Sequence, residues 1–275
     1  MNTQEIYYKL MEAIESATNS KTGEVKIVED AINKIKELSW GPNITVQSGF
    51  CHQKPYAFFI NPNSLFTKQK TELGDLLFVV KYTNNNRIID KRALFFQAKY
   101  NNSSNQFQIE LHQFHFYKQI NNIEFKFGNS VYKNLGVIPI HWNNISTTNE
   151  FGDYILLGKN YAADLSTNEI ASQYEHKKNG HFYYDLNFLC ARCHCQRHHC
   201  KTRCTAKSPL FDFLTPFGKG NQIHGQFELF INLIYKYLGM ISDPPEEHEG
   251  FWEESGKGGF GLVEITISNG ENTKE

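Results

Sequence analysis

The first part of the chain shows apolar residues at helical spacing. In residues 4–18 they recur three or four positions apart, as at Ile6, Leu10 and Ile14, and residues 24–38 repeat the pattern. This spacing places the apolar side chains on one face of a helix. The polar residues 19–23 separate the two segments. The sequence therefore predicts two consecutive amphipathic helices.

Two nearly continuous apolar runs follow and predict the centre of a sheet. Residues 76–80 read Leu-Leu-Phe-Val-Val, and residues 93–96 read Ala-Leu-Phe-Phe. Such runs are typical of strands that are covered on both faces. The polar residues 83–86 between them predict a turn. Further strands are predicted at 44–46, 56–60, 135–140, 154–157 and 261–267, and further helices at 108–120 and 222–241. Together these elements predict an α/β protein.

Length allows one elaborated domain or two smaller ones. The 275 residues can bury a sizeable core. We expect a core with its N-terminal helices at 1–140, and a C-terminal region at 141–275 that contains a Cys- and His-rich segment, the helix 222–241 and the final strand. No internal repeat is visible.

Charge and hydrophobicity limit the possible partners. Lys and Arg total 28 against 29 Asp and Glu, so the formal charge is -1. Without an overall positive field, a nucleic-acid partner would have to be held by local basic patches. No run approaches the roughly 18 apolar residues of a membrane span, and the start lacks a basic region followed by an apolar run. The sequence predicts a cytoplasmic protein without membrane contact.

Polar side chains stand at the ends of the two central runs. Asp75 directly precedes the first run, while Gln97 and Lys99 follow the second. Residues two apart in a strand point to the same face, so Gln97 and Lys99 share one face and Ala98 points to the other. If the two strands pair as a hairpin, Asp75 meets the Gln97/Lys99 face at one edge of the sheet.

This combination suits phosphodiester hydrolysis. That reaction needs a hard cation held by carboxylate and amide or carbonyl oxygens, such as Mg²⁺ or Mn²⁺. We expect Asp75 to anchor the ion and Gln97 to add its amide oxygen. Lys99 would stabilise charge on the phosphate or help to activate the attacking water.

The pattern resembles the PD-(D/E)XK nuclease superfamily, in the Gln-x-Lys variant of Mrr-like restriction enzymes. The resemblance covers about residues 24–120, and Asp75, Gln97 and Lys99 match its motif one by one. It implies a restriction-endonuclease-like mixed sheet flanked by helices. The implied activity is a metal-dependent endonuclease with DNA as the expected substrate and RNA left open. The segment 72–77 with its Gln-Ala-Lys strand also resembles nuclease-like proteins of antiviral defence, which implies a bacterial defence role.

The resemblance also implies a further acidic residue at the site, and this sequence departs from the usual motif at Gln97. Many members add a Glu from the helix before the core, for which Glu29 is the first candidate and Glu24 the second; Glu72 is a third possible ligand. Gln97 replaces the acid of most members, and a neutral ligand weakens metal binding and could leave the site inactive. A homodimer or a partner defence protein is expected, since cutting both strands often takes two sites.

A Cys- and His-rich segment lies at 190–204. Five of the six cysteines crowd there, which in a chain without a signal peptide indicates metal before disulfides. Zn²⁺ takes four such ligands, and pairs with two or three residues between them are the usual way for a loop to supply them. The first choice is Cys190, Cys193, Cys200 and Cys204, with Cys195, His194, His198 and His199 as alternates.

Two further questions about this segment stay open. The neighbouring cations Arg192, Arg197, Lys201 and Arg203 predict contacts with nucleic acid, although a purely structural zinc loop is equally compatible. An iron-sulfur cluster is the second alternative. Some nucleases of the superfamily hold one with a Cys before the core and three after it, and Cys51 with three of the clustered cysteines echoes that order.

Two rival functions remain beside the nuclease. One is a catalytically inactive, zinc-stabilised nuclease-like module that binds nucleic acid or protein. The other is an interaction or sensor protein in which Asp75 and Lys99 form an internal ion pair. Gln113 is expected near the active face, whereas His52, His112, His115 and His141 are interpreted as ordinary residues.

Overall fold

Two helices open the fold, as the apolar spacing predicts. The computed structural model describes residues 1–52, 56–60, 68–118, 122–125, 138–141, 151–174, 180–187, 208–238, 240 and 258–268. Helix α1 (Thr3–Ser20) begins at a capping box between Asn2 and Glu5. Helix α2 (Glu24–Glu37) follows Gly23, whose φ of 88° favours glycine. None of the described helices is long and apolar enough to span a membrane.

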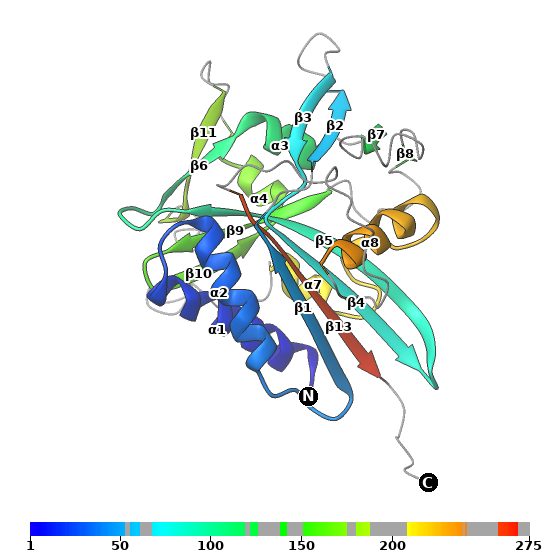
Figure 1. The fold of residues 1–275 in the computed structure, drawn as a ribbon. Helices are drawn as coiled ribbons and strands as arrows, with labels where there is room; N and C mark the ends of the chain where they lie inside the picture. The colour runs from blue at the N-terminus through cyan, green and yellow to red at the C-terminus, as the bar shows by residue number, and fades with distance from the viewer. Residues whose placement is uncertain are drawn as a thin grey trace.

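A mixed sheet of seven strands forms the centre of the molecule (Figure 1). Its order is β1-β13-β4-β5-β9-β10, and β12 also pairs with β5. The pairs β13/β4 and β5/β9 are parallel and the others antiparallel. The sheet and its flanking helices confirm the predicted α/β class. The strands are β1 (Ile44–Cys51), β4 (Leu76–Asn84), β5 (Arg87–Tyr100), β9 (Gly152–Gly158), β10 (Tyr161–Leu165), β12 (Asn221–Gln222) and β13 (Phe260–Ser268).

The last strand of the chain lies in the middle of this sheet. β13 is antiparallel to β1 on one side and parallel to β4 on the other. Val263 and Ile265 pack on one face of the sheet, and Leu262 packs on the other. The boundary at residue 140 stays a prediction, but strands from both sides of it pair in this one sheet.

Smaller elements surround the central sheet. β6 (Gln106–Glu110) pairs with β11 (His181–Asp185), and a four-stranded sheet has the order β3-β2-β7-β8. The other described helices are α3 (Leu111–Lys118), α4 (Thr167–Ala171), α7 (Pro209–Phe213) and α8 (Gly225–Tyr237). The remaining strands are β2 (Tyr56–Ile60), β3 (Lys68–Glu72), β7 (Asn122–Phe125) and β8 (Ile138–His141).

Two predicted helices begin later than expected. Residues 108–110 belong to β6, because Phe107 and Ile109 alternate with polar residues and only the alternate positions are buried. Residues 221–222 form β12, since Asn221 pairs with Ala93 of β5. The helices therefore start at Leu111 and Gly225.

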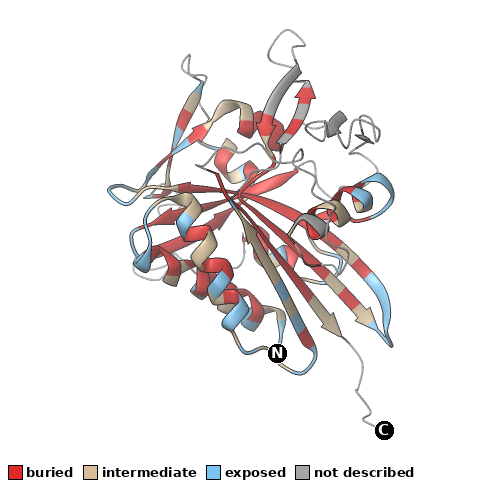
Figure 2. Cartoon of the chain, in the orientation of Figure 1, coloured by how far each residue is buried: buried red, intermediate tan, exposed pale blue. Residues whose placement is uncertain are grey.

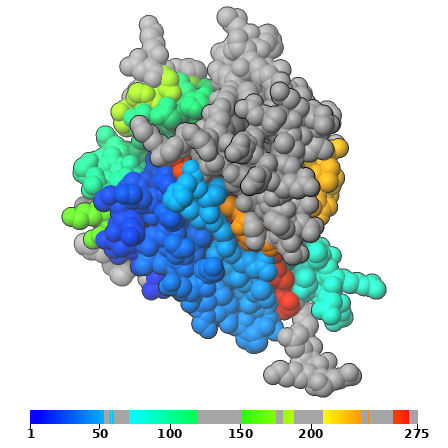
Figure 3. Space-filling view, in the orientation of Figure 1, coloured from blue at the N-terminus to red at the C-terminus, as the bar shows by residue number. Residues whose placement is uncertain are grey.

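The sheet has an apolar core on each face (Figure 2). On the first, which we call the α1/α2 face, Leu76, Phe78 and Phe96 pack with apolar residues of α1, α2 and α7. On the second, the α3/α8 face, Leu77 and Phe95 pack with those of α3, α4 and α8. Figure 3 shows that α1, α2 and β1 form a large part of one outer surface.

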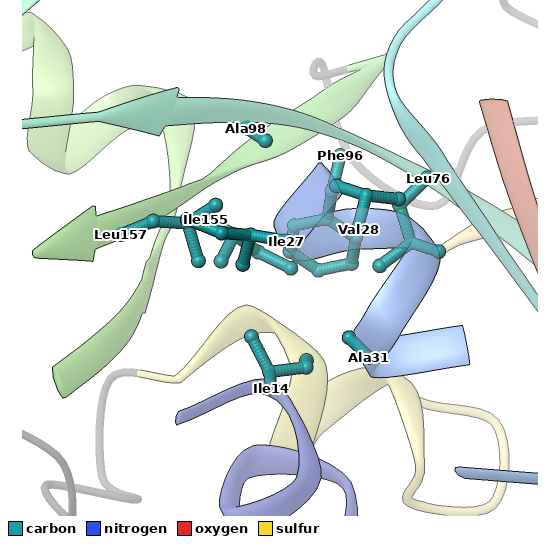
Figure 4. Close-up of a pocket in the computed structure, with 9 residues that line it drawn as sticks. All are labelled: Ile14, Ile27, Val28, Ala31, Leu76, Phe96, Ala98, Ile155 and Leu157. Carbon is teal, nitrogen blue, oxygen red and sulfur yellow. The ribbon is translucent and has the colours of Figure 1, made fainter. Parts of the chain in front are cut away.

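A small cavity lies between α1, α2 and the sheet (Figure 4). Its volume is about 10 Å³, which is close to the least that holds one water molecule. Apolar side chains line it and offer a water no hydrogen bond, so it is a packing defect and not a ligand site. The lining residues are Ile14, Ile27, Val28, Ala31, Leu76, Phe96, Ala98, Ile155 and Leu157.

Candidate active site

The hairpin of β4 and β5 brings the predicted acid to the Gln-Ala-Lys segment. The strands pair antiparallel, with Leu76 opposite Phe96. Asn85 and Asn86 in the turn both have positive φ, 47° and 60°, as the tight turn of a twisted hairpin requires. The Asp75 amide donates to the Phe96 carbonyl at 2.9 Å. The hairpin on which the predicted convergence depends is thus confirmed.

Asp75 is bound directly to the end of β5. Its Oδ2 accepts hydrogen bonds from the Ala98 amide at 2.8 Å and from Nε2 of Gln97. Asp75 and Gln97 are each only 1% exposed. Donors from both the main chain and a side chain therefore fix the position of this carboxylate.

The three motif residues lie on the α3/α8 face. Phe96 and Ala98 point to the cavity on the α1/α2 face, as Figure 4 shows. Strand side chains alternate, so Gln97 and Lys99 point the opposite way. The contact between Gln97 and Asp75 places the carboxylate on that same side.

Lys99 is a buried cation without a carboxylate partner in the described part of the chain. It is 8% exposed, and no described acid lies within ion-pair distance of it, Asp75 included. The two other buried cations of this part do have partners. Arg92 Nε lies 2.9 Å from Asp90, and Lys219 Nζ lies 2.8 Å from Asp153. A largely buried lysine without a carboxylate partner is costly, so Lys99 differs from the other two.

A second polar atom at the site also lacks a partner. Oε1 of Gln97 is buried and accepts no hydrogen bond from a described residue. Tyr154 lies beside Gln97 on the neighbouring strand β9, and its buried hydroxyl has no described partner either. Buried polar atoms normally bind protein or an ordered ligand. These atoms therefore mark a place where something other than the described protein is expected to bind.

Among the candidate helix acids, Glu24 lies nearest to the motif strand. Its Oε1 accepts from the Tyr100 amide at 3.1 Å. Ala98 and Tyr100 are two residues apart, so their amides point to the same edge of β5 and lie roughly 7 Å apart. Asp75 and Glu24 thus bind successive amides of one strand edge. The Glu29 carboxylate instead lies 3.6 Å from Nε2 of His52 and is partly exposed.

Helix α3 covers the site. The Tyr117 hydroxyl donates to the Leu73 carbonyl at 2.8 Å. Burial raises the pKa of Tyr117 well above its ordinary value, and the negative charges of Asp75 and Glu72 act in the same direction. Gln113, one turn earlier, is buried with Oε1 unpartnered among the described residues, and its place near the active face stays a prediction.

His112, in the first turn of α3, is a neighbour that sequence reasoning missed. Burial lowers its pKa, the Lys99 charge lowers it further, and Glu110 and Glu72 oppose both effects. Lys99, Glu72 and Glu110 are thus the charged groups that act on this imidazole. Its position directly before Gln113 was the one available signal. Tyr154 was missed because only the fold shows that β9 is next to β5.

The donor set fits a hard cation only in part. Asp75 supplies a carboxylate, Gln97 an unpartnered amide oxygen, and Glu24 or Glu72 could supply a second carboxylate. Among the described residues, however, no three His, Cys, Asp or Glu side chains are grouped closely enough to hold a metal. An ion would thus need waters and a small rearrangement of the Gln97 amide.

The predicted zinc ligands and their cations lie outside the described residues. This holds for the whole segment 190–204, with its cysteines, histidines, Arg192, Arg197, Lys201 and Arg203. Cys51, the other cysteine, is half-buried against the core of the α3/α8 face. The zinc site and the iron-sulfur alternative therefore stay predictions.

Known proteins offer no match to this chain. No family model, no curated protein and no solved structure matches it. The resemblance to PD-(D/E)XK nucleases stays a prediction that rests on its motif residues.

Proposed function

We propose that the chain is a metal-dependent nuclease whose active site comprises Asp75, Gln97 and Lys99. The carrying observation is Lys99, a residue only 8% exposed that follows directly on Gln97 and Ala98, the two residues that hold the Asp75 carboxylate, and has no described carboxylate partner of its own. A phosphate oxygen is the natural partner for such a group, because it supplies the missing negative charge. Arg92 and Lys219, the other buried cations in the part of the chain that the structure describes, are paired, so a general tolerance of unpaired charge does not explain Lys99.

Each residue has a distinct role in this proposal. Asp75 and the Gln97 amide oxygen hold Mg²⁺ or Mn²⁺, with Glu24 favoured over Glu29 as the additional acid and Glu72 as the alternative. The ion would bind the scissile phosphate and lower the pKa of a water molecule. Lys99 stabilises the charge that develops on the phosphate oxygens. Gln97 now donates its Nε2 to Asp75, so its amide must turn to present oxygen to an ion.

The restriction-endonuclease-like fold, the DNA substrate and a role in bacterial defence belong to the same proposal. The antiparallel β4/β5 hairpin, the helix α3 and the return to the parallel strand β9 support that fold. The defence role rests on the sequence resemblance alone.

The alternative is an inactive nuclease-like module that binds nucleic acid or protein. The specific observation in its favour is the lack of three grouped metal ligands among the described residues. In that case the buried Lys99 would bind a phosphate without cleaving its ester bonds.

A cleavage assay separates the two functions. Purified protein is incubated with labelled DNA and RNA in Mg²⁺, Mn²⁺ or EDTA, beside the variants Asp75→Asn and Lys99→Met. Lys36→Met, on the exposed surface of α2, is the matched control. The nuclease proposal expects cleavage that needs the ion, is lost in both site variants and persists in the control. Binding without any ion-dependent cleavage would favour the inactive module.

A further inference from the structure

The candidate site lies below the surface of the protein. Asp75 and Gln97 are each 1% exposed and Lys99 is 8% exposed. A phosphate that reaches the Asp75 and Gln97 side chains must therefore enter the protein, and the chain on either side of it must follow. This depth limits the shape of any substrate.

The helix above the site is part of the packed core. The Tyr117 ring of α3 lies against two glycines, since a Cβ at Gly74 would meet its hydroxyl at 2.8 Å and one at Gly152 would meet its ring at 3.0 Å. Phe116 packs on Phe151 with a ring-centroid distance of 4.7 Å. Lifting α3 would break these contacts, and close-packed cores do not deform at low cost. The site is thus not covered by a loosely attached lid.

Half-buried side chains indicate where the site approaches solvent. His112, Glu110 and Glu72 are each partly exposed, and their elements border the site, since β6 contacts β5 and α3 contacts β3. They lie at the start of α3 and at the end of β3. The approach to Lys99 therefore runs past the junction of β6 and α3.

An exposed tyrosine and a half-buried histidine lie on the ribbon that ends at this junction. His181 of β11 is opposite Glu110 of β6, and Tyr183 is two residues further along the same strand. The two rings meet edge to face with centroids 5.4 Å apart, and Tyr183 is 48% exposed. Aromatic side chains of this kind stack with unpaired bases. The acids beside them disfavour a row of phosphates, so bases are the better ligand there.

We propose that the substrate is single-stranded nucleic acid, or an unpaired end, and not intact duplex. This inference rests on the proposed nuclease function. An unpaired base stacks on His181 and Tyr183 while the flexible backbone bends past His112 to Lys99. A duplex holds its phosphates on a stiff cylinder and its bases inside, so it cannot offer both contacts. A phosphate held even about 1 Å from the reacting position loses roughly a hundred-fold in rate.

The test compares one sequence in three forms. These are a labelled single strand, its blunt duplex and a relaxed closed-circular duplex, each incubated with the full chain and Mn²⁺. The proposal expects the single strand to be cut about a hundred-fold faster than the circle, following the misplacement cost given above. Cutting of the circle at a rate similar to the single strand would overturn it.

Binding measurements distinguish failure of the inference from failure of the nuclease proposal. If nothing is cut but Asp75→Asn binds the single strand more tightly than the duplex by anisotropy, the substrate class stands and the nuclease fails. If no form is cut or bound, both fail.

A pair of variants tests the aromatic contact. Tyr183→Ala should weaken single-strand binding about five-fold or more, the usual effect of losing one stacked base. Phe217→Ala removes another exposed aromatic ring, 67% exposed beside Asp90 in the far half of β5, and should leave binding unchanged. Equal effects of the two variants would overturn the proposed place of Tyr183.

Discussion

The two faces of the central sheet satisfy their polar groups differently. On the α1/α2 face, the buried Asp164 accepts hydrogen bonds from Tyr7 at 3.0 Å, from the Leu210 amide at 2.9 Å and from Ser208. On the α3/α8 face, Lys99 has no described carboxylate and Gln97 Oε1 no described donor. On the first face, the polar groups bind one another and stabilise the fold. The second retains binding capacity that the described protein does not use, as expected of a site for an external ligand.

The strongest challenge to this comparison is Asp75→Asn, which removes the fixed charge of the α3/α8 face. We expect cleavage to fall about a thousand-fold, because a bound ion supplies several kcal/mol of transition-state stabilisation. Initial rates in saturating Mn²⁺ measure the loss. Asp30→Asn, on the partly exposed surface of α2, is the control and should retain full activity. Wild-type rates in the Asp75 variant would remove this residue from the site.

Truncating the α1/α2 face should affect stability alone. Ile14 is 2% exposed and lines the small cavity, so Ile14→Ala enlarges an existing void. The free energy of unfolding should fall by about 3 kcal/mol, and by about 1 kcal/mol for Ile14→Val. Urea unfolding measures both, and the cleavage rate of the folded variants should not change. Loss of activity without loss of stability would mean that the two faces are not independent.

The Asp164 cluster predicts a pH dependence. Burial raises the pKa of Asp164 above its ordinary value of 3.8, although its hydrogen bonds oppose the shift. The folded state then binds this proton more tightly than the unfolded state, so the contribution of Asp164 to stability is greatest below 3.8 and falls as pH rises through the folded pKa. Unfolding across the acidic range should show this fall in wild type and a flatter profile in Asp164→Asn. Identical profiles would contradict it.

A smaller effect distinguishes the two helix acids. Glu24→Gln keeps an acceptor for the Tyr100 amide but removes a charge near Asp75, so the Mn²⁺ concentration for half-maximal cleavage should rise about ten-fold. Glu29→Gln changes only the contact with His52 and should leave that concentration unaltered. A metal titration of cleavage compares the two variants. A larger effect at Glu29 would identify it as the ligand.

The sequence predicts this site better than its surroundings. Strand alternation and the hairpin suffice to bring Asp75 to Gln97, because both are local rules. The choice between Glu24 and Glu29 depends on how α2 packs across the sheet, which spacing does not contain. Tyr154 becomes a neighbour only because β9 pairs with β5 after a long connection. That no described acid pairs with Lys99 likewise requires coordinates.

The sequence also predicts the final strand, but it does not predict the position of that strand in the sheet. Residues 261–267 have the apolar content of a buried strand, yet nothing local specifies that they separate β1 from β4. The helix predicted at 108–110 is wrong because aromatic residues on both sides of Glu110 obscure the short alternation of β6.

The most direct test of the central claim measures the stability and the activity of Lys99→Met in one preparation. If Lys99 is a buried cation retained for a phosphate, removing its charge should raise the free energy of unfolding by about 1 kcal/mol or more and abolish cleavage. A variant that is less stable than wild type would show that the ammonium serves the fold. A variant that is more stable and still cleaves would show that the proposed active site is wrong.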